Sequence, residues 1–311
     1  MNIEQMAKLG TLIPAYLDDC RTQKRLDEKT LKAYRIDLEQ LQQKLPDINV
    51  CEIKPEMLAS VFANWHETRK PKTVKRKIAS IKAFFHYLEE KGFLEQNPFV
   101  KLHTRFREPK VLPRTIPEHN LERLLGVMYK DYQNASVEKE KTSVFQDIVI
   151  IEFLFGTGVR ISELCMLQTE DINLVEGEVL IHGKGRKERI IQIPDEQLQQ
   201  LLCKYRDMIT QDEDGYFFRN HCGRPLRDQS VRQMIQKYCN KAGITQHITP
   251  HMFRHTFATS LLESDVNLRC IQELLGHSSI QTTEIYTHVS KAKQRQVLKE
   301  HHPRKSLNIT F

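Results

Sequence analysis

Residues 144–167 read VFQDIVIIEFLFGTGVRISELCML, and this stretch decides the fold. Its apolar run predicts a long helix, which we expect to break at Gly156 and Gly158 and to be followed by a short second helix. The stretch VEKEKTSVFQ at 137–146 is expected to form a loop before the helix. Arg160 comes directly after the glycine-containing bend, where packing does not require a cation.

The rest of the C-terminal part is predicted to be mostly helical, with one β-signal. The segment GEVLIHGKGRKERIIQIP, at 177–194, is typical of two strands joined by a turn that contains Gly-Lys-Gly. We expect further helices at 230–243, 250–264 and 268–277, with Gly243 and Gly276 as C-terminal stops.

The first hundred residues predict helices. Asp27 or Thr30 is expected to cap a helix at 30–45, and further helices are expected at 55–69 and at 71–92. A proline-rich, basic stretch at 104–116 follows and has no clean period. In a chain of 311 residues it predicts a linker between two domains, at 1–103 and 117–311.

Composition excludes several classes of protein. The chain is 40% hydrophobic and 28% charged, which is typical of a globular protein with a full core. It has no apolar run long enough to span a membrane and no secretory signal at its start, so we expect a cytoplasmic protein. Its seven cysteines are scattered without a CxxC pair, which argues against disulfides and a zinc knuckle.

The net charge of +7 lies mostly in the N-terminal part. Residues 1–110 hold 21 Lys+Arg against 15 Asp+Glu, whereas the rest of the chain holds 26 against 25. This favours a polyanionic partner such as DNA, although an ordinary solubilising surface explains it equally well. Cations also crowd the first turns of the helix at 71–92, where they oppose its dipole. These candidates for contacts with DNA phosphates, or alternatively for a solvated face, are Lys72, Lys75, Arg76 and Lys77.

Besides Arg160, cations and polar groups gather at four further places in the C-terminal part. They are Lys184 in the hairpin tip, His251 with Arg254 on one helix face, His277 after Gly276, and Tyr286 nine residues later. Together these side chains have the chemistry needed to bind and cleave a phosphodiester. Two arginines can hold its non-bridging oxygens, and a lysine or histidine can protonate the leaving oxygen. A tyrosine of pKa about 10 can attack once cations and a histidine base activate it. We expect neither a metal nor a cofactor.

Each of these residues alone has a plainer explanation. Arg160 could be a surface cation beside Glu163, and Tyr286 could be a core aromatic. His251 and His255 are spaced like a zinc pair, but HMFRH lacks the glutamate of HExxH and places a cation between the histidines. Only the joint pattern discriminates between structure and function.

The sequence resembles the tyrosine recombinase (phage integrase) family, most closely its Xer-like bacterial members and the integrases of mobile elements. TGVRISELCML, HGKGRKERIIQIP, TPHMFRHTFATSLLE and ELLGHSSIQTTEIYTHV are similar to the family's catalytic boxes in order and spacing. The resemblance implies a mainly α fold with a small β-sheet in the C-terminal domain. A helical core-binding (SAM-like) domain and a catalytic domain would form a clamp on DNA.

The resemblance also implies a role for each site residue. Arg160 and Arg254 would clamp the phosphate, with Glu163 supporting them, and Lys184 would be the general acid for the 5′-oxygen. His251 would act as base or proton shuttle. His277 would hydrogen-bond the scissile phosphate, and Tyr286 would form the 3′-phosphotyrosine.

The implied reaction is site-specific recombination of double-stranded DNA through a Holliday junction. It would be carried out by a homotetramer, or by a heterotetramer with a related recombinase, for integration or excision of a mobile element or for chromosome dimer resolution. Residues 290–300 would supply a helix exchanged between protomers. The alternatives are a type IB topoisomerase-like enzyme, a catalytically silent DNA-binding regulator and, more distantly, a zinc hydrolase.

Overall fold

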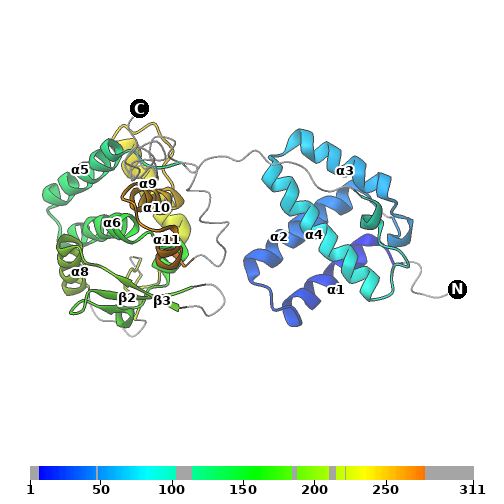
Figure 1. Ribbon diagram of the computed structural model, residues 1–311, viewed down its shortest axis with the longest axis horizontal. Helices are drawn as coiled ribbons and strands as arrows, with labels where there is room; N and C mark the ends of the chain where they lie inside the picture. The colour runs from blue at the N-terminus through cyan, green and yellow to red at the C-terminus, as the bar shows by residue number, and fades with distance from the viewer. Residues whose placement is uncertain are drawn as a thin grey trace, which may run out of the picture. The chain divides into compact units, whose positions relative to one another are not determined.

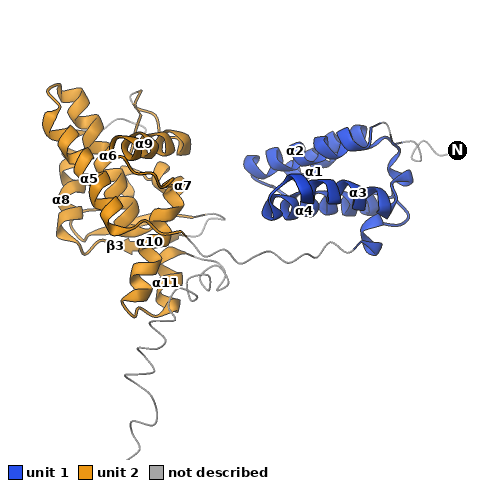
Figure 2. Cartoon of the chain, turned by 90° about the horizontal axis from the view of Figure 1, so that it is seen from above, with its two compact units in different colours: residues 1–110 blue, residues 111–311 orange. Residues whose placement is uncertain are grey.

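The fold is seen in a computed structural model, which describes residues 7–46, 48–102, 114–183, 188–209, 215–220 and 222–276 (Figure 1). The chain divides into two compact units, residues 1–110 and 111–311 (Figure 2). Most of the predicted linker at 104–116 lies outside the described residues. In the described part of the chain, no helix is both long enough and apolar enough to cross a membrane.

The first unit consists of helices. Their apolar stripes pack into one core, in which Tyr16, Phe84 and Phe85 are fully buried. Asp27 rather than Thr30 caps the second helix, since its side chain accepts a hydrogen bond from the Thr30 backbone N–H at 2.8 Å. The described elements are α1 (Leu9–Thr22), α2 (Glu28–Lys44), α3 (Pro55–Thr68), α4 (Pro71–Glu90) and the 3₁₀ helices Val50–Glu52 and Pro98–Lys101.

The second unit is mainly helical and contains a small sheet. Its α-helices are α5 (Glu118–Asn134), α6 (Glu138–Thr157), α7 (Ile161–Cys165), α8 (Glu196–Met208), α9 (Asp228–Lys241), α10 (Pro250–Glu263) and α11 (Leu268–Leu275). Its other elements are the 3₁₀ helix Thr169–Asp171 and the strands β1 (Ile172–Asn173), β2 (Glu178–His182) and β3 (Glu188–Gln192). The predicted fold class, mainly α with a small sheet in the C-terminal domain, is confirmed.

Helix α6 is the centre of the second unit, where it packs against α5, α8 and α10. The prediction of a loop at 137–146 was wrong, because α6 already begins at Glu138. Acidic residues in its first turn suit the positive end of the helix dipole. The predicted break at Gly156 was also wrong. Gly156 lies inside α6, and a Cβ atom there would approach Cδ2 of Leu198 to 2.8 Å, so glycine permits close packing on α8.

The sheet is antiparallel, with strand order β1-β2-β3. The predicted hairpin is confirmed as β2 and β3, and the short β1 on its edge was not predicted. His182 pairs with Glu188 at the end of the ladder, so these two residues flank the hairpin tip. Residues 184–187 of the tip lie outside the described residues.

Candidate active site

The bend between α6 and α7 fixes Arg160. Gly158, at φ +63°, ends α6 in the left-handed conformation that glycine adopts without strain. Arg160 then precedes α7. Glu163 on that helix accepts hydrogen bonds from the Arg160 backbone N–H at 2.9 Å and from its guanidinium at 2.6 Å. About a third of the Arg160 side chain remains exposed (34%), so one side of the guanidinium faces solvent.

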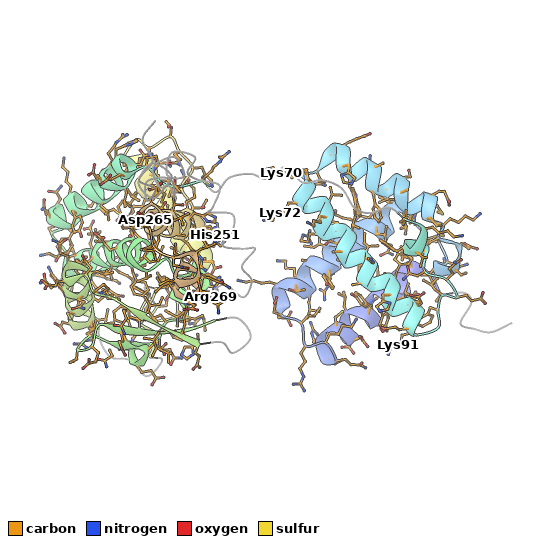
Figure 3. All side chains as sticks on the ribbon, in the orientation of Figure 1. Lys70, Lys72, Lys91, His251, Asp265 and Arg269 are labelled. Carbon is orange, nitrogen blue, oxygen red and sulfur yellow. The ribbon has the colours of Figure 1, made fainter. Side chains whose placement is uncertain are left out.

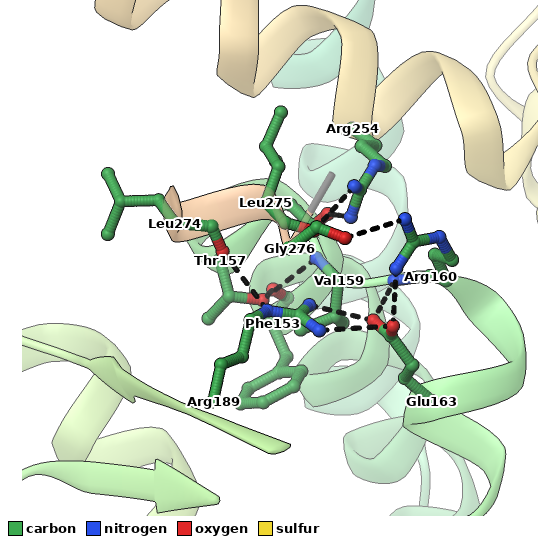
Figure 4. A network of polar contacts seen from close by, with 11 residues as sticks. Phe153, Thr157, Val159, Arg160, Glu163, Arg189, Arg254, Leu274, Leu275 and Gly276 are labelled. Carbon is green, nitrogen blue, oxygen red and sulfur yellow. Dashed lines mark hydrogen bonds and ion pairs between the residues drawn. The ribbon is translucent and has the colours of Figure 1, made fainter. Parts of the chain in front are cut away.

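Arg254 reaches the same bend from α10. Its side chain is buried and donates hydrogen bonds to the carbonyl oxygens of Gly158 at 2.8 Å and Leu275 at 2.6 Å (Figure 4). The two predicted phosphate-binding arginines are therefore brought together, although they lie almost a hundred residues apart in the chain.

Arg189 on β3 belongs to the same cluster, and the sequence reasoning missed it. It donates hydrogen bonds to both carboxylate oxygens of Glu163, at 3.1 and 2.8 Å, and to the carbonyl oxygen of Leu274 at 3.1 Å. Strand alternation could have found it, since Arg189 stands two residues before the buried Ile191 and so shares its core-facing side. A cation on that side of a strand needs a partner inside the protein.

The three arginines converge on the C-terminus of α11. Arg189, Arg254 and Arg160 donate to the consecutive carbonyl oxygens of Leu274, Leu275 and Gly276, respectively (Figure 4). The last carbonyls of a helix have no partner within it and carry its negative dipole end, so cations stabilise them. The cluster therefore fixes the point at which the chain leaves α11, directly before His277.

Glu163 is the counter-charge of this cluster. Burial would raise the pKa of its carboxyl, but hydrogen bonds from Arg189 and from the Arg160 backbone outweigh burial and lower the pKa to about 2. Glu163 is therefore ionised at neutral pH. One carboxylate against three guanidinium groups leaves an excess of positive charge, which suits an anionic ligand.

His251 lies one turn before Arg254 on α10, at the surface of the second unit but partly enclosed by its neighbours (Figure 3). Partial burial and the charges of Arg232, Arg254 and Arg160 lower the pKa of its imidazole. His251 is therefore mainly neutral at pH 7 and able to accept a proton. The neighbouring His255 also has a lowered pKa, because of burial, His251 and Arg254. Among the described residues, no group of three or more His, Cys, Asp or Glu side chains could hold a metal ion.

Comparisons with known proteins place this geometry in a family. The phage integrase family model matches residues 114–293, and the phage integrase N-terminal SAM-like domain model matches residues 13–92. The chain belongs to the phage integrase family. A tyrosine recombinase of Agathobacter rectalis is 50% identical, over 98% of this chain and 100% of its own length. Tyrosine recombinase XerD of Staphylococcus haemolyticus is 34% identical, over 95% of this chain and 100% of its own.

Solved structures agree with this assignment. The crystal structure of XerA recombinase is 27% identical, with a TM-score of 0.52, and the alignment covers 95% of this chain and 99% of that one. XerH recombinase bound to a palindromic difH substrate shares the fold at 22% identity, with a TM-score of 0.75 over 93% of this chain and 83% of that one. The predicted family and enzyme class are confirmed: the chain is a tyrosine recombinase, an enzyme of site-specific recombination.

Part of the predicted site of this tyrosine recombinase lies outside the described residues. Lys184, His277, Tyr286 and the segment 290–300 are in that part of the chain. Arg160, Glu163, His251 and Arg254 are described, and all four belong to the second unit.

The cations predicted to contact DNA in the first unit of the recombinase differ in burial. Lys77 is buried, and its ammonium group donates to Asp37 at 2.9 Å and to Gln40 at 2.7 Å and lies 5.0 Å from the centre of the Trp65 ring. Arg76 also pairs with Asp37. The prediction of a DNA contact was wrong for Lys77, because the counter-charge it needs is the buried Asp37.

The other two cations of this group are placed differently. Lys72 and Lys75 are exposed near the start of α4, where Figure 3 shows Lys70 and Lys72 together. They stay candidates for phosphate contacts, and Arg76 is a weaker candidate because Asp37 already engages it.

Proposed function

We propose that this recombinase cuts and rejoins double-stranded DNA at specific sites through a covalent bond between Tyr286 and a 3′-phosphate. The observation that carries the proposal is the convergence of Arg160 and Arg254 on one bend of the second unit. Two guanidinium groups held side by side match the non-bridging oxygens of a phosphodiester.

The arginines would act mainly on the transition state. Charge builds up on the phosphate oxygens during attack, and donors fixed beforehand stabilise that charge without reorganising. Burial of Arg254 and the bonds of Arg160 to Glu163 supply this rigidity. Arg160 keeps an exposed side, from which a phosphate can be reached.

The proton transfers follow from the remaining residues. The phenol oxygen of Tyr286 attacks phosphorus, the bond from phosphorus to the 5′-oxygen breaks, and a 3′-phosphotyrosine forms. His251, mainly neutral at pH 7, accepts the phenol proton, and Lys184 donates a proton to the leaving 5′-oxygen. His277 donates a hydrogen bond to the phosphate. The 5′-hydroxyl of another strand reverses these steps and rejoins the DNA.

The assembly is proposed from relatives. The solved structures that share the fold include a lambda integrase tetramer bound to a Holliday junction, with a TM-score of 0.71 at 16% identity. We infer a tetramer on paired sites, formed by this chain alone or with a related recombinase, in the cytoplasm. The biological role of this recombination would be integration or excision of a mobile element, or resolution of chromosome dimers.

A trapping experiment tests the proposal. The protein is incubated with a pool of nicked duplexes that carry a randomised segment upstream of the nick. Cleavage just before the nick releases a short 5′-hydroxyl fragment, which diffuses away, so the covalent adduct accumulates. We expect an adduct in denaturing gels with the wild type and with the control Tyr216→Phe, and none with Tyr286→Phe. Sequencing the trapped DNA identifies the site.

Two outcomes would favour the alternatives. A wild type that gives no adduct while still binding DNA is a DNA-binding regulator. A wild type that forms the adduct and relaxes supercoiled DNA, but exchanges no strands between two differently labelled copies of the trapped duplex, is a type IB topoisomerase-like enzyme. Exchange of labels between the two copies establishes recombination.

A further inference from the structure

We propose that Arg189 is a positioning residue for DNA cleavage, which holds Glu163 and the end of α11 so that Arg160 meets the scissile phosphate in one orientation. This inference rests on the proposed function.

The first step concerns Glu163. One of its carboxylate oxygens accepts from the guanidinium groups of both Arg160 and Arg189, at 2.6 and 3.1 Å. The other accepts from the Arg160 backbone N–H at 2.9 Å and from Arg189 at 2.8 Å. The two-pronged bond from Arg189 therefore fixes the plane of the carboxylate, and that plane in turn sets the direction of the Arg160 guanidinium.

The second step concerns charge. Glu163 is buried with only 5% of its side chain exposed, and the two cations that face it are Arg160 and Arg189. A buried carboxylate that loses one of two cationic partners binds a proton more readily. A protonated Glu163 holds Arg160 less tightly, so Arg189 keeps Glu163 in the form that orients Arg160.

The third step concerns position. Arg189 lies on β3 next to the hairpin tip that carries Lys184, and its backbone pairs with Ile181 on β2. Its side chain bonds to Leu274 at the end of α11, three residues before His277. One side chain thus joins the base of the hairpin to Glu163 and to the end of α11.

The fit of Gly276 supports this role independently. Gly276 is left-handed, at φ +62°, and a Cβ atom there would lie 3.0 Å from Cδ of Arg189. The Arg189 side chain therefore runs directly against the turn that ends α11, and any larger residue at position 276 would displace it. Figure 4 shows this approach together with the bonds to Glu163 and Leu274.

The experiment measures single-turnover cleavage of the duplex identified by trapping. We expect Arg189→Gln to slow adduct formation roughly 100-fold, as misplaced reacting groups do, while the affinity for the same duplex stays within about twofold of the wild type. Protonation of His251 should slow the wild type and Arg189→Gln alike at acid pH. Arg189→Gln should show a second rise of the rate with pH as Glu163 ionises, and the wild type should lack this second rise. Arg206→Gln, at an exposed position on α8, is the matched control and should behave as the wild type.

Two further variants separate positioning from folding. Arg189→Lys keeps the charge but lacks the two-pronged bond, so it should cleave slowly without the second rise that comes from Glu163. The double variant Arg189→Gln/Glu163→Gln should lose less rate than the two single losses combined, because Arg189 acts in part through Glu163. Thermal unfolding of every variant verifies the fold.

Several results would overturn the inference. Cleavage by Arg189→Gln at the wild-type rate and pH dependence would do so, as would additive losses in the double variant. If Arg189→Gln fails to fold, Arg189→Lys decides, and a folded Arg189→Lys with wild-type cleavage refutes the role. A wild type that forms no adduct refutes the proposed function itself, and the inference with it.

Discussion

The buried guanidinium of Arg254 donates a hydrogen bond to the carbonyl oxygen of Gly158 at 2.8 Å, across a separation of 96 residues in the chain. The direction of that carbonyl depends on the left-handed backbone of Gly158. A Cβ atom at position 158 would also lie 2.5 Å from Cδ1 of Phe257 and 3.1 Å from Cδ2 of Leu275. The orientation of Arg254, which we propose binds the scissile phosphate, thus rests on the absence of one methyl group at position 158.

Gly158→Ala is therefore expected to destabilise the protein and to impair cleavage. The strained backbone alone should lower the free energy of unfolding by about 1–3 kcal/mol, and the contact with Phe257 adds to this. Cleavage should slow further than the loss of folded protein explains, because the partner of Arg254 moves. Urea denaturation and single-turnover cleavage measure the two effects.

Gly126→Ala is the control for this substitution. Gly126 lies inside α5 with nothing within 4 Å of an added Cβ atom, so alanine should raise the free energy of unfolding by about 0.5–1 kcal/mol. Its cleavage rate should not change. Equal stability and cleavage for Gly158→Ala and the wild type would contradict the argument.

Substitutions of two lysines on α4 should have different effects, one on DNA binding and the other on the stability of the fold. Lys72→Gln removes an exposed cation, so it should weaken binding to a labelled duplex and reduce the salt dependence, as the slope of log K against log salt, by about 0.9. Its melting temperature should not change. Fluorescence anisotropy at several salt concentrations measures the slope.

Lys77→Met is the counterpart on the same helix. It removes one partner of a buried ion pair and leaves Asp37 short of a charge, which typically costs about 3–5 kcal/mol of the free energy of unfolding. The salt slope of the protein that remains folded should equal that of the wild type. A reduced slope for Lys77→Met with unchanged stability would restore Lys77 as a DNA contact.

The sequence predicted the fold class and most helices because caps, glycines and apolar periods are local signals. Each of three residues marks a helix end by its own chemistry: Asp27 through its side chain, Pro55 through its fixed φ angle and Gly276 through its left-handed backbone. The same reliance on local signals gave the wrong prediction of a helix break at Gly156. Its place inside α6 depends on Leu198 of α8, and one local pattern carries no information about a neighbouring helix.

The candidate site was predictable in part. The spacing of Arg160 and Arg254 within motifs was visible, whereas the ion pairs that fix them join residues far apart in the chain. Asp37 lies 40 residues before Lys77, and Glu163 lies 26 residues before Arg189. Nothing local distinguishes a lysine that faces DNA from one that faces a buried carboxylate, so the sequence could not assign Lys77.

Lys184 is predicted to increase the cleavage rate only when the leaving group, such as the 5′-oxygen, needs a proton in order to depart. Lys184→Ala should slow cleavage of the ordinary phosphodiester by about 10²–10⁴-fold, the usual contribution of a general acid. A 5′-bridging sulfur at the scissile position leaves without protonation, so Lys184→Ala should cleave that duplex almost as fast as the wild type. Lys187→Ala is the control from the same hairpin and should cleave both duplexes normally. An unrescued Lys184→Ala would assign Lys184 to phosphate binding instead.

The pH dependence of cleavage should report on His251. A base must be neutral to accept the Tyr286 proton, so the rate should fall as the pH drops below the pKa of His251, which lies under the ordinary value of 6.5. The charges facing this imidazole are Arg232 and Asp228 on α9, Arg254 on its own helix, and Arg160 at the bend.

Arg232→Gln tests the electrostatic cause of that shift. After burial, Arg232 is the largest influence that lowers the pKa of His251, so its removal should raise that pKa and move the acid limb to higher pH. The rate well above the limb should change little, whereas His251→Gln should abolish the limb and slow cleavage at every pH. Single-turnover rates between about pH 5 and 8 measure both effects around the ordinary histidine pKa, with Arg206→Gln as the control. A limb that stays in place in Arg232→Gln, or that survives in His251→Gln, would show that another group supplies the base.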